Sequence, residues 1–219
     1  MTKTIKVLLN VAVLGLACSA GALVMIALNR PGPGAQVGAE RIPAAEMGLR
    51  VLPFALTDHE GRPADQSVLE GEWTLVSFIF TNCPGACPVM TARMAEVQRA
   101  MPESPLRFAG LSLDAERDTP EKLRTFAAEY VLDLDRWTLL TGDDAQVRRM
   151  VEEGLMLVVD KETTAEITLA DGSTMRNITH PTRLFLVGPD LRVMEMYESG
   201  NPAELERIAA DVARYTDSE

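Results

Sequence analysis

Two cysteines four positions apart lie where a buried strand is predicted to turn into a helix. The run Thr-Asn-Cys-Pro-Gly-Ala-Cys-Pro (81–88) follows residues 73–80, which are apolar and rich in β-branched and aromatic side chains. Such a segment is typical of a strand covered on both faces. Apolar residues at helical spacing follow at 89–101. The proline after the second cysteine fits the first helical position, so we expect Cys87 to be the N-cap and Cys83 to lie on the preceding turn.

A thiol near a helix N-terminus has a pKa below the free value of about 8.5, because the positive end of the helix dipole favours the thiolate. Thiolates attack disulfides and bind soft metals. A passive disulfide is the alternative, since cysteines this close along a turn can reach the Cα separation of ~5.5 Å that a bridge prefers. So short a loop gives little entropic stabilisation, which favours a bridge that opens and closes.

The first thirty residues differ from the rest of the chain. Lys3 and Lys6 precede an uncharged run at 7–29, and Arg30 follows it. A span of ~20 apolar residues crosses a bilayer, whereas a signal peptide has an apolar core of only ~7–15. The sequence therefore predicts a transmembrane anchor at 7–29, with residues 1–6 in the cytoplasm because of the flanking charges. We expect a single-pass protein of the bacterial inner membrane with its C-terminal domain in the periplasm.

The remaining chain is predicted to hold a linker and one domain. Residues 30–48 lack a periodic apolar pattern and read as a linker, and 49–219 has a common single-domain length. The whole chain carries a formal charge of −11. Its first thirty residues contain three cations and no acid, so the exported part carries −14. Nucleic acid is therefore a poor partner, and a cation or a basic protein surface a better one. The exported part contains only two cysteines, Cys83 and Cys87, which indicates that this pair carries the chemistry.

Strands and helices alternate along the predicted domain, which describes an α/β fold with a central mixed sheet flanked by helices. A hairpin is expected around Asp171-Gly172, paired from the segments 155–159 and 165–179. The other expected strands are 51–57, 73–80, 106–113, 137–140, 183–187 and 192–197, and the expected helices are 89–101, one opening at Thr119-Pro120, one ending near Glu153, and 201–215.

Four motifs in one order resemble the Sco/SenC family. They are Phe78-Ile-Phe-Thr-Asn-Cys83-Pro-Gly-Ala-Cys87-Pro88, Ser112-Leu-Asp-Ala-Glu-Arg-Asp-Thr-Pro-Glu121, Leu140-Thr-Gly142, and His180 eight residues before Gly188-Pro-Asp190. The resemblance spans roughly residues 50–215 and implies a membrane-anchored, thioredoxin-like copper protein that metallates cytochrome c oxidase. It further implies copper bound by Cys83, Cys87 and His180, with Asp114 as a supporting acidic residue. The implied partners are the copper-site subunit of the oxidase and an upstream periplasmic copper donor.

Two thiolates and one imidazole suit copper in either oxidation state, whereas zinc usually takes a fourth ligand. Two departures from the family pattern keep a second hypothesis open. Thr179 and Pro181 flank His180 where the family has Asp and a small hydroxyl residue, and the hairpin replaces a tyrosine-containing insertion. Pro181 also resembles the cis-proline of thioredoxins. The alternative function is therefore a thiol-disulfide oxidoreductase in which Cys83 attacks and Cys87 resolves.

Other polar and sulfur-containing residues are given structural roles. His59 lies in a polar turn and is expected to be solvated, and Asp118 is expected to serve the N-terminus of its helix. Met90 and Met94 share one helix face and are predicted to lie in the core.

Overall fold

The computed structural model describes residues 44–160, 164–169 and 171–216. The chain divides into two compact units, Met1–Arg41 and Ile42–Glu219. The predicted anchor at 7–29 lies outside the described residues, and none of the helices within the described ranges is long and apolar enough to span a membrane. Residues 44–47, which the sequence assigned to the linker, form a 3-10 helix with Ala44 buried, so the second unit extends N-terminally of the predicted boundary.

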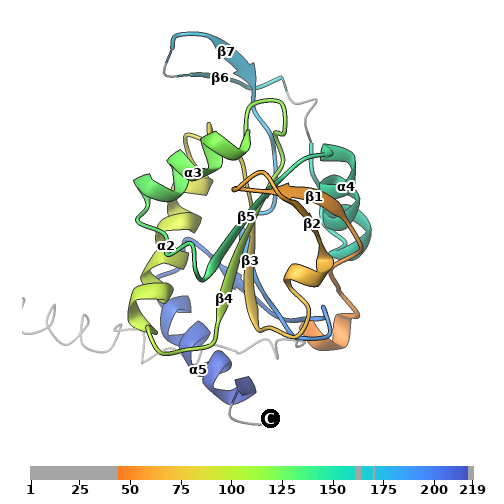
Figure 1. Cartoon of the computed structure of the whole chain (residues 1–219), viewed down its shortest axis with the longest axis vertical. Helices are drawn as coiled ribbons and strands as arrows, with labels where there is room; N and C mark the ends of the chain where they lie inside the picture. The colour runs from red at the N-terminus through yellow and green to blue at the C-terminus, as the bar shows by residue number, and fades with distance from the viewer. Residues whose placement is uncertain (1–43, 161–163, 170, 217–219) are drawn as a thin grey trace, which may run out of the picture. The chain divides into compact units, whose positions relative to one another are not determined.

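Figure 1 shows the arrangement of the second unit. Its strands are β1 (Ala55–Asp58), β2 (Pro63–Asp65), β3 (Thr74–Ile79), β4 (Arg107–Ser112), β5 (Trp137–Thr141), β6 (Glu166–Thr168), β7 (Thr174–Arg176), β8 (Arg183–Val187) and β9 (Val193–Glu198). Its α-helices are α2 (Ala86–Ala100), α3 (Pro120–Glu129), α4 (Asp144–Arg149) and α5 (Glu204–Thr216), with 3-10 helices η1 (Ala44–Met47) and η2 (Gln66–Val68) and a π-helical turn η3 (Met150–Gly154).

A seven-stranded mixed sheet forms the centre of the unit, in the order β2-β1-β5-β4-β3-β8-β9. Strands β3, β4 and β5 are parallel, while β8 runs antiparallel to β3, and β1 antiparallel to β5. Helices α2, α3 and α5 lie on one face of the sheet and α4 on the other (Figure 1). Because β3, β4 and β5 progress in one direction across the sheet, right-handed crossovers put both α2 and α3 on the same face. The predicted central mixed sheet flanked by helices is confirmed.

The core sits between this sheet and its helices. All six residues of β3 are buried, as a strand covered on both faces requires. Met90 and Met94 of α2 have no exposed surface, which confirms that they belong to the core. The hairpin predicted around Asp171-Gly172 is also confirmed, since β6 and β7 pair antiparallel in a separate two-stranded sheet.

Two local predictions are wrong. Segment 155–159 forms no strand: Met156 takes a positive φ of 55° and Val158 is largely exposed, so the chain passes this region as an irregular connection. Helix α2 starts earlier than predicted, with Gly85 as its N-cap, so Cys87 is the second helical residue. Pro88 becomes the third, where its missing N–H is tolerated because the first four helical N–H groups have no intrahelical partner.

Candidate metal centre

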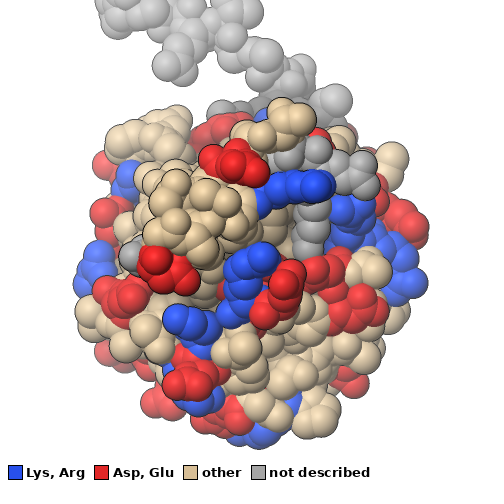
Figure 2. Space-filling view, turned by 90° about the horizontal axis from the view of Figure 1, so that it is seen from above, with Lys and Arg blue, Asp and Glu red and all other residues tan. Residues whose placement is uncertain are grey.

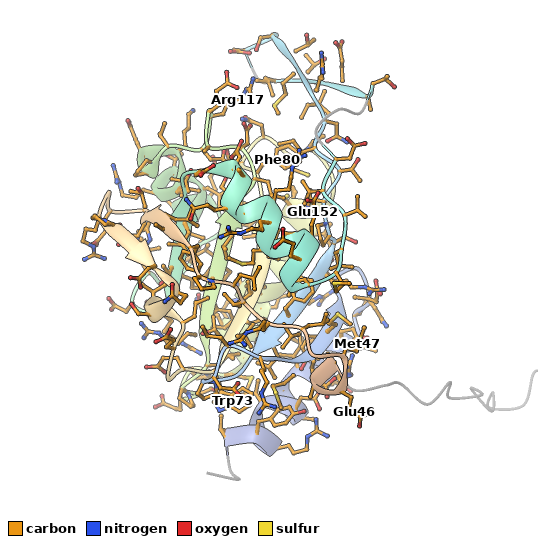
Figure 3. The ribbon with its side chains drawn as sticks, turned by 90° about the vertical axis from the view of Figure 1, so that its right-hand side faces the viewer. Glu46, Met47, Trp73, Phe80, Arg117 and Glu152 are labelled. Atoms are coloured by element: carbon orange, nitrogen blue, oxygen red, sulfur yellow. The ribbon has the colours of Figure 1, made fainter. Side chains whose placement is uncertain are left out.

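The thiol turn lies at the carboxyl end of β3, and the sheet brings a distant segment beside it. Strand β8 pairs antiparallel with β3, with Val76 opposite Phe185, so the chain just before β8 returns next to the end of β3. Figure 3 shows Phe80 toward the upper end of the molecule and Trp73 at its lower end, which marks the direction of the strand. His180 lies in the returning segment, three residues before β8. Strand pairing therefore places an imidazole beside the two thiols.

Three potential ligand atoms converge at this point. One sulfur each from Cys83 and Cys87 and a ring nitrogen of His180 all lie within 4.8 Å of one another. The Sγ atom of Cys87 is 3.4 Å from Nε2 of His180. Cys87 is 1% exposed, whereas Cys83 is partly exposed, and both are free thiols. A cavity of about 250 Å³ opens onto this group, lined by Cys83, Pro84, Gly85, Ala86, Asn177, Ile178, Thr179, His180 and Thr182.

The imidazole of His180 is oriented by its own neighbours. Its Nδ1 atom is 2.9 Å from the carbonyl oxygen of Pro181. A carbonyl oxygen can only accept, so Nδ1 carries the proton and donates it, which leaves the lone pair of Nε2 facing the sulfurs in the neutral ring. The ring of Phe80 packs edge-to-face against the imidazole at a centroid distance of 5.5 Å. A backbone carbonyl thus takes the orienting role that a carboxylate plays in other metal sites.

Pro181 itself departs from the thioredoxin resemblance. The described residues contain no cis peptide bond, so Pro181 follows His180 through a trans bond. Its importance at this site comes from the carbonyl oxygen that holds the imidazole. The backbone N–H and carbonyl of the neighbouring Thr179 pair with the backbone of Asp160 in an isolated antiparallel bridge.

The two thiols have opposite pKa shifts. A hydrogen bond from Cys87 is the largest cause that lowers the pKa of Cys83, and the backbone N–H groups at the helix start add to it. The pKa of Cys87 is raised, first because its proton is held in that bond to Cys83 and then because the side chain is buried. Cys83 is therefore the thiolate of the pair and Cys87 its hydrogen-bond donor.

The structure brings Asp118, rather than Asp114, against the thiol turn. Asp118 has no exposed surface, and its carboxylate accepts from the backbone N–H and hydroxyl of Thr81 and from the hydroxyl of Ser112. Asp114 is also buried, but its carboxylate accepts from Arg117 and lines a second cavity with that residue. The N-cap of α3 is Thr119, which accepts from Lys122 as predicted, and the carboxylate of Asp118 before it is bound to Thr81 and Ser112.

A signal for Asp118 was present in the sequence. Thr119 and the proline after it already supply the N-cap and the first residue of a helix, so the acid before them was not needed as a cap. The prediction for His59 is wrong. His59 is 5% exposed and its Nδ1 accepts from the backbone N–H of Leu139, whereas the sequence predicted a solvated side chain.

Charges of both signs occur on the end of the molecule that carries the β6–β7 hairpin. Figure 2 looks down on the end of the molecule that carries the β6–β7 hairpin, and blue and red residues interleave across it. Arg117 shows the pattern locally, because it pairs with both Asp114 and Glu116. A partner that approaches this face meets positive and negative groups side by side.

Comparisons with known proteins agree with this architecture. The SCO1/SenC family model matches residues 44–217. The SCO1 protein homolog of Bacillus subtilis (strain 168) is 31% identical over 169 residues, which cover 76% of this chain and 82% of that protein. BsSco, described as a member of the Sco family of cytochrome c oxidase assembly proteins with a disulfide switch, is 27% identical with a TM-score of 0.65, covering 82% of this chain and 98% of that one.

ScoI of Bradyrhizobium japonicum, solved with copper bound, is 27% identical with a TM-score of 0.60, covering 76% of this chain and 99% of that one. The match to the SCO1/SenC family model covers most of this chain, and the matched residues include the thiol turn and His180. The chain therefore belongs to the SCO1/SenC family and has its thioredoxin-like fold.

Proposed function

We propose that this protein is a membrane-anchored copper metallochaperone that serves the assembly of the binuclear copper site of cytochrome c oxidase. Copper is its cargo, and Cys83, Cys87 and His180 are its ligands. The observation that carries the proposal is the convergence of two sulfurs and one ring nitrogen within 4.8 Å, with Nε2 of His180 turned toward Cys87.

The donor set fits copper on chemical grounds. Soft thiolates favour Cu(I), and an imidazole nitrogen also suits Cu(II), so one set of three ligands serves both oxidation states. Zinc is less well matched, because a structural zinc site usually has four protein ligands. Binding requires both thiols to lose their protons. Cys83 is already the thiolate of the pair, and Cys87 releases the proton that it donates to Cys83.

The position of the ligands suits transfer to another protein. Cys83 is partly exposed beside a cavity, whereas Cys87 is buried, so an incoming thiolate of a partner reaches the metal from the side of Cys83. Copper then leaves as the partner's ligands replace those of this chain one at a time. The partner we propose is the copper-site subunit of the oxidase, with a periplasmic copper donor upstream. Support comes from the description of BsSco as a cytochrome c oxidase assembly protein and from copper-bound ScoI.

The proposed location is the bacterial inner membrane, with the compact unit in the periplasm. The uncharged run at 7–29 and the cations that precede it support an anchor of this orientation.

Anaerobic titration of the reduced, detergent-solubilised chain with Cu(I), in competition with a chromophoric chelator, tests the proposal. We expect one copper per chain, and no stoichiometric binding by the Cys83→Ser/Cys87→Ser variant. Equal binding by this variant would show that the thiols are not the ligands.

One observation favours a second function, a thiol-disulfide oxidoreductase. The lowered pKa of Cys83 makes it a nucleophile at neutral pH, and Cys87 lies beside it to resolve a mixed disulfide. In that reaction the Cys83 thiolate attacks a disulfide of the target, and one target thiolate leaves. Cys87 then attacks the mixed disulfide, so this chain ends with a Cys83–Cys87 bridge and the target with two thiols. Two electrons pass from this chain to the target.

A further inference from the structure

Asp118 is a buried carboxylate held by neutral donors. Its side chain has no exposed surface, and the ion pairs found among the described residues do not include it. Burial raises the pKa of Asp118, and hydrogen bonds from Ser112 and Thr81 oppose that effect. Burying a carboxylate without a cation is unfavourable, so its hydrogen bonds must offset the loss of water.

All of these donors belong to two segments. The hydroxyl of Thr81 is 2.5 Å from Oδ1 of Asp118, and the backbone N–H of Thr81 lies 3.1–3.2 Å from the two carboxylate oxygens. The hydroxyl of Ser112 is 2.5 Å from Oδ2. Thr81 begins the thiol turn, and Ser112 is the last residue of β4. Asp118 therefore ties the thiol turn to the end of the neighbouring strand.

The hydrogen bonds of Asp118 with Thr81 lie beyond the end of β3, where the chain has left the hydrogen-bonding ladder of the sheet. The last backbone bond between β3 and the segment after β4 joins the N–H of Leu113 to the carbonyl of Ile79. Between Ile79 and the start of α2 at Ala86, the described backbone hydrogen bond within the turn joins the N–H of Cys83 to the carbonyl of Phe80. The N-cap of α2, Gly85, has no side-chain hydrogen bond. The contacts of Asp118 with Thr81 lie between these points, two residues before Cys83.

We propose that Asp118 is a positioning residue for the metal centre: by holding Thr81 against Ser112, it fixes the location of Cys83 relative to Cys87 and His180. The inference rests on the proposed function, because the first measurement that tests it is copper affinity. Its consequence is that the ligand atoms stand close together before the metal arrives, which favours binding because less ordering is then required.

Substitutions at Asp118 separate position from charge. Asp118→Asn is nearly isosteric and retains an oxygen that accepts both bonds from Thr81, whereas Asp118→Ala leaves Thr81 and Ser112 without their acceptor. Asp58→Ala is the matched control. Asp58 is also a buried carboxylate with three donors, all within its own turn, and β5 and β4 lie between its strand and β3.

The first measurement is Cu(I) affinity by chelator competition, with circular dichroism to confirm folding. We expect Asp118→Ala to bind copper at least about 10-fold more weakly, within the ~10–100-fold typical of groups that orient metal ligands. We expect Asp118→Asn and Asp58→Ala to stay close to the wild type. Unchanged affinity in folded Asp118→Ala overturns the inference, and so does an equal loss in Asp118→Asn, because charge rather than position would then be the cause.

Thr81 supplies the test if Asp118→Ala does not fold. Thr81→Val removes the hydroxyl donor and keeps the shape, whereas Thr81→Ser keeps the donor. We expect weaker copper binding by Thr81→Val than by Thr81→Ser, and equal affinities would overturn the inference.

A second readout is independent of copper. The equilibrium of the Cys83–Cys87 disulfide against glutathione depends on how the two thiols are held, and we expect it to shift in Asp118→Ala but not in Asp58→Ala or Asp118→Asn. If the wild type binds no copper, the proposed function fails, yet this equilibrium still decides the role of Asp118. The same equilibrium constant in all four proteins would overturn the inference.

Discussion

The Nε2 atom of His180 lies 3.4 Å from the Sγ atom of Cys87, although 93 positions separate the two residues along the chain. The antiparallel pairing of β3 with β8 creates this proximity, and the carbonyl of Pro181 turns the ring so that Nε2 faces the sulfur. The candidate metal centre is thus built from a local cysteine pair and one residue delivered by the sheet.

His180→Ala should separate the two proposed functions. The substitution removes one of three copper ligands, so we expect copper binding to weaken by at least about an order of magnitude, since even groups that only orient ligands contribute ~10–100-fold. Reduction of a disulfide-bonded peptide from the oxidase subunit should change much less. Copper competition and peptide reduction are measured on the same preparation.

His59→Asn is the control for that experiment, since His59 is the other histidine of the chain and accepts a backbone N–H away from the thiols. Its oxygen can replace Nδ1 as the acceptor, and copper affinity should stay unchanged. Retained copper binding in His180→Ala together with lost peptide reduction would favour the oxidoreductase function.

The two thiols should differ in reactivity. Cys83 is partly exposed and its pKa is lowered, so iodoacetamide should modify it first and remain effective below the pH at which an ordinary thiol reacts. Cys87→Ala removes the hydrogen bond that stabilises the Cys83 thiolate, so the pKa of Cys83 should rise and its alkylation should shift to higher pH. Peptide mapping by mass spectrometry over a pH series measures both effects. Faster modification of Cys87 than of Cys83 would contradict the assigned roles.

Oxidation should close a Cys83–Cys87 bridge and prevent copper loading. The two sulfur atoms lie within 4.8 Å of each other, close enough for a small movement to join them. A disulfide has no thiolate left to donate to a metal. Mild oxidation of the metal-free protein should remove both alkylatable thiols and abolish Cu(I) binding, and reduction should restore both. Protein loaded with copper beforehand serves as the comparison and should resist bridge formation. Two alkylatable thiols that persist after oxidation without metal would argue against a redox gate.

Residues 7–29 should be required for membrane association and dispensable for copper binding. The full chain should co-sediment with lipid vesicles, because an uncharged span of this length partitions into a bilayer, whereas residues 31–219 should stay in the supernatant. Both forms should bind copper with the same stoichiometry, since the ligands belong to the unit Ile42–Glu219. Co-sedimentation of the shortened form would show that another surface binds the membrane.

Local features of the fold and of the site could be predicted from the amino-acid sequence. Apolar periodicity identified β3 and the buried methionine face of α2, because those patterns record which side of an element is covered. Turn residues identified the β6–β7 hairpin. The spacing of Cys83 and Cys87 fixed their proximity, since four positions at a strand-to-helix turn leave little freedom.

The distant groups that contact the thiol turn are set by strand pairing, which local sequence patterns do not reveal. His180 was assigned to the site through a family resemblance, and the pairing of β3 with β8 supplies the physical cause of its position. Asp118 accepts a hydrogen bond from Thr81, and the buried His59 accepts one from Leu139. In both cases the partner lies in or directly after a strand that is distant in sequence. A periodic pattern says that a side chain is covered but not by what, since hydrogen-bond partners depend on the register between strands far apart in the chain.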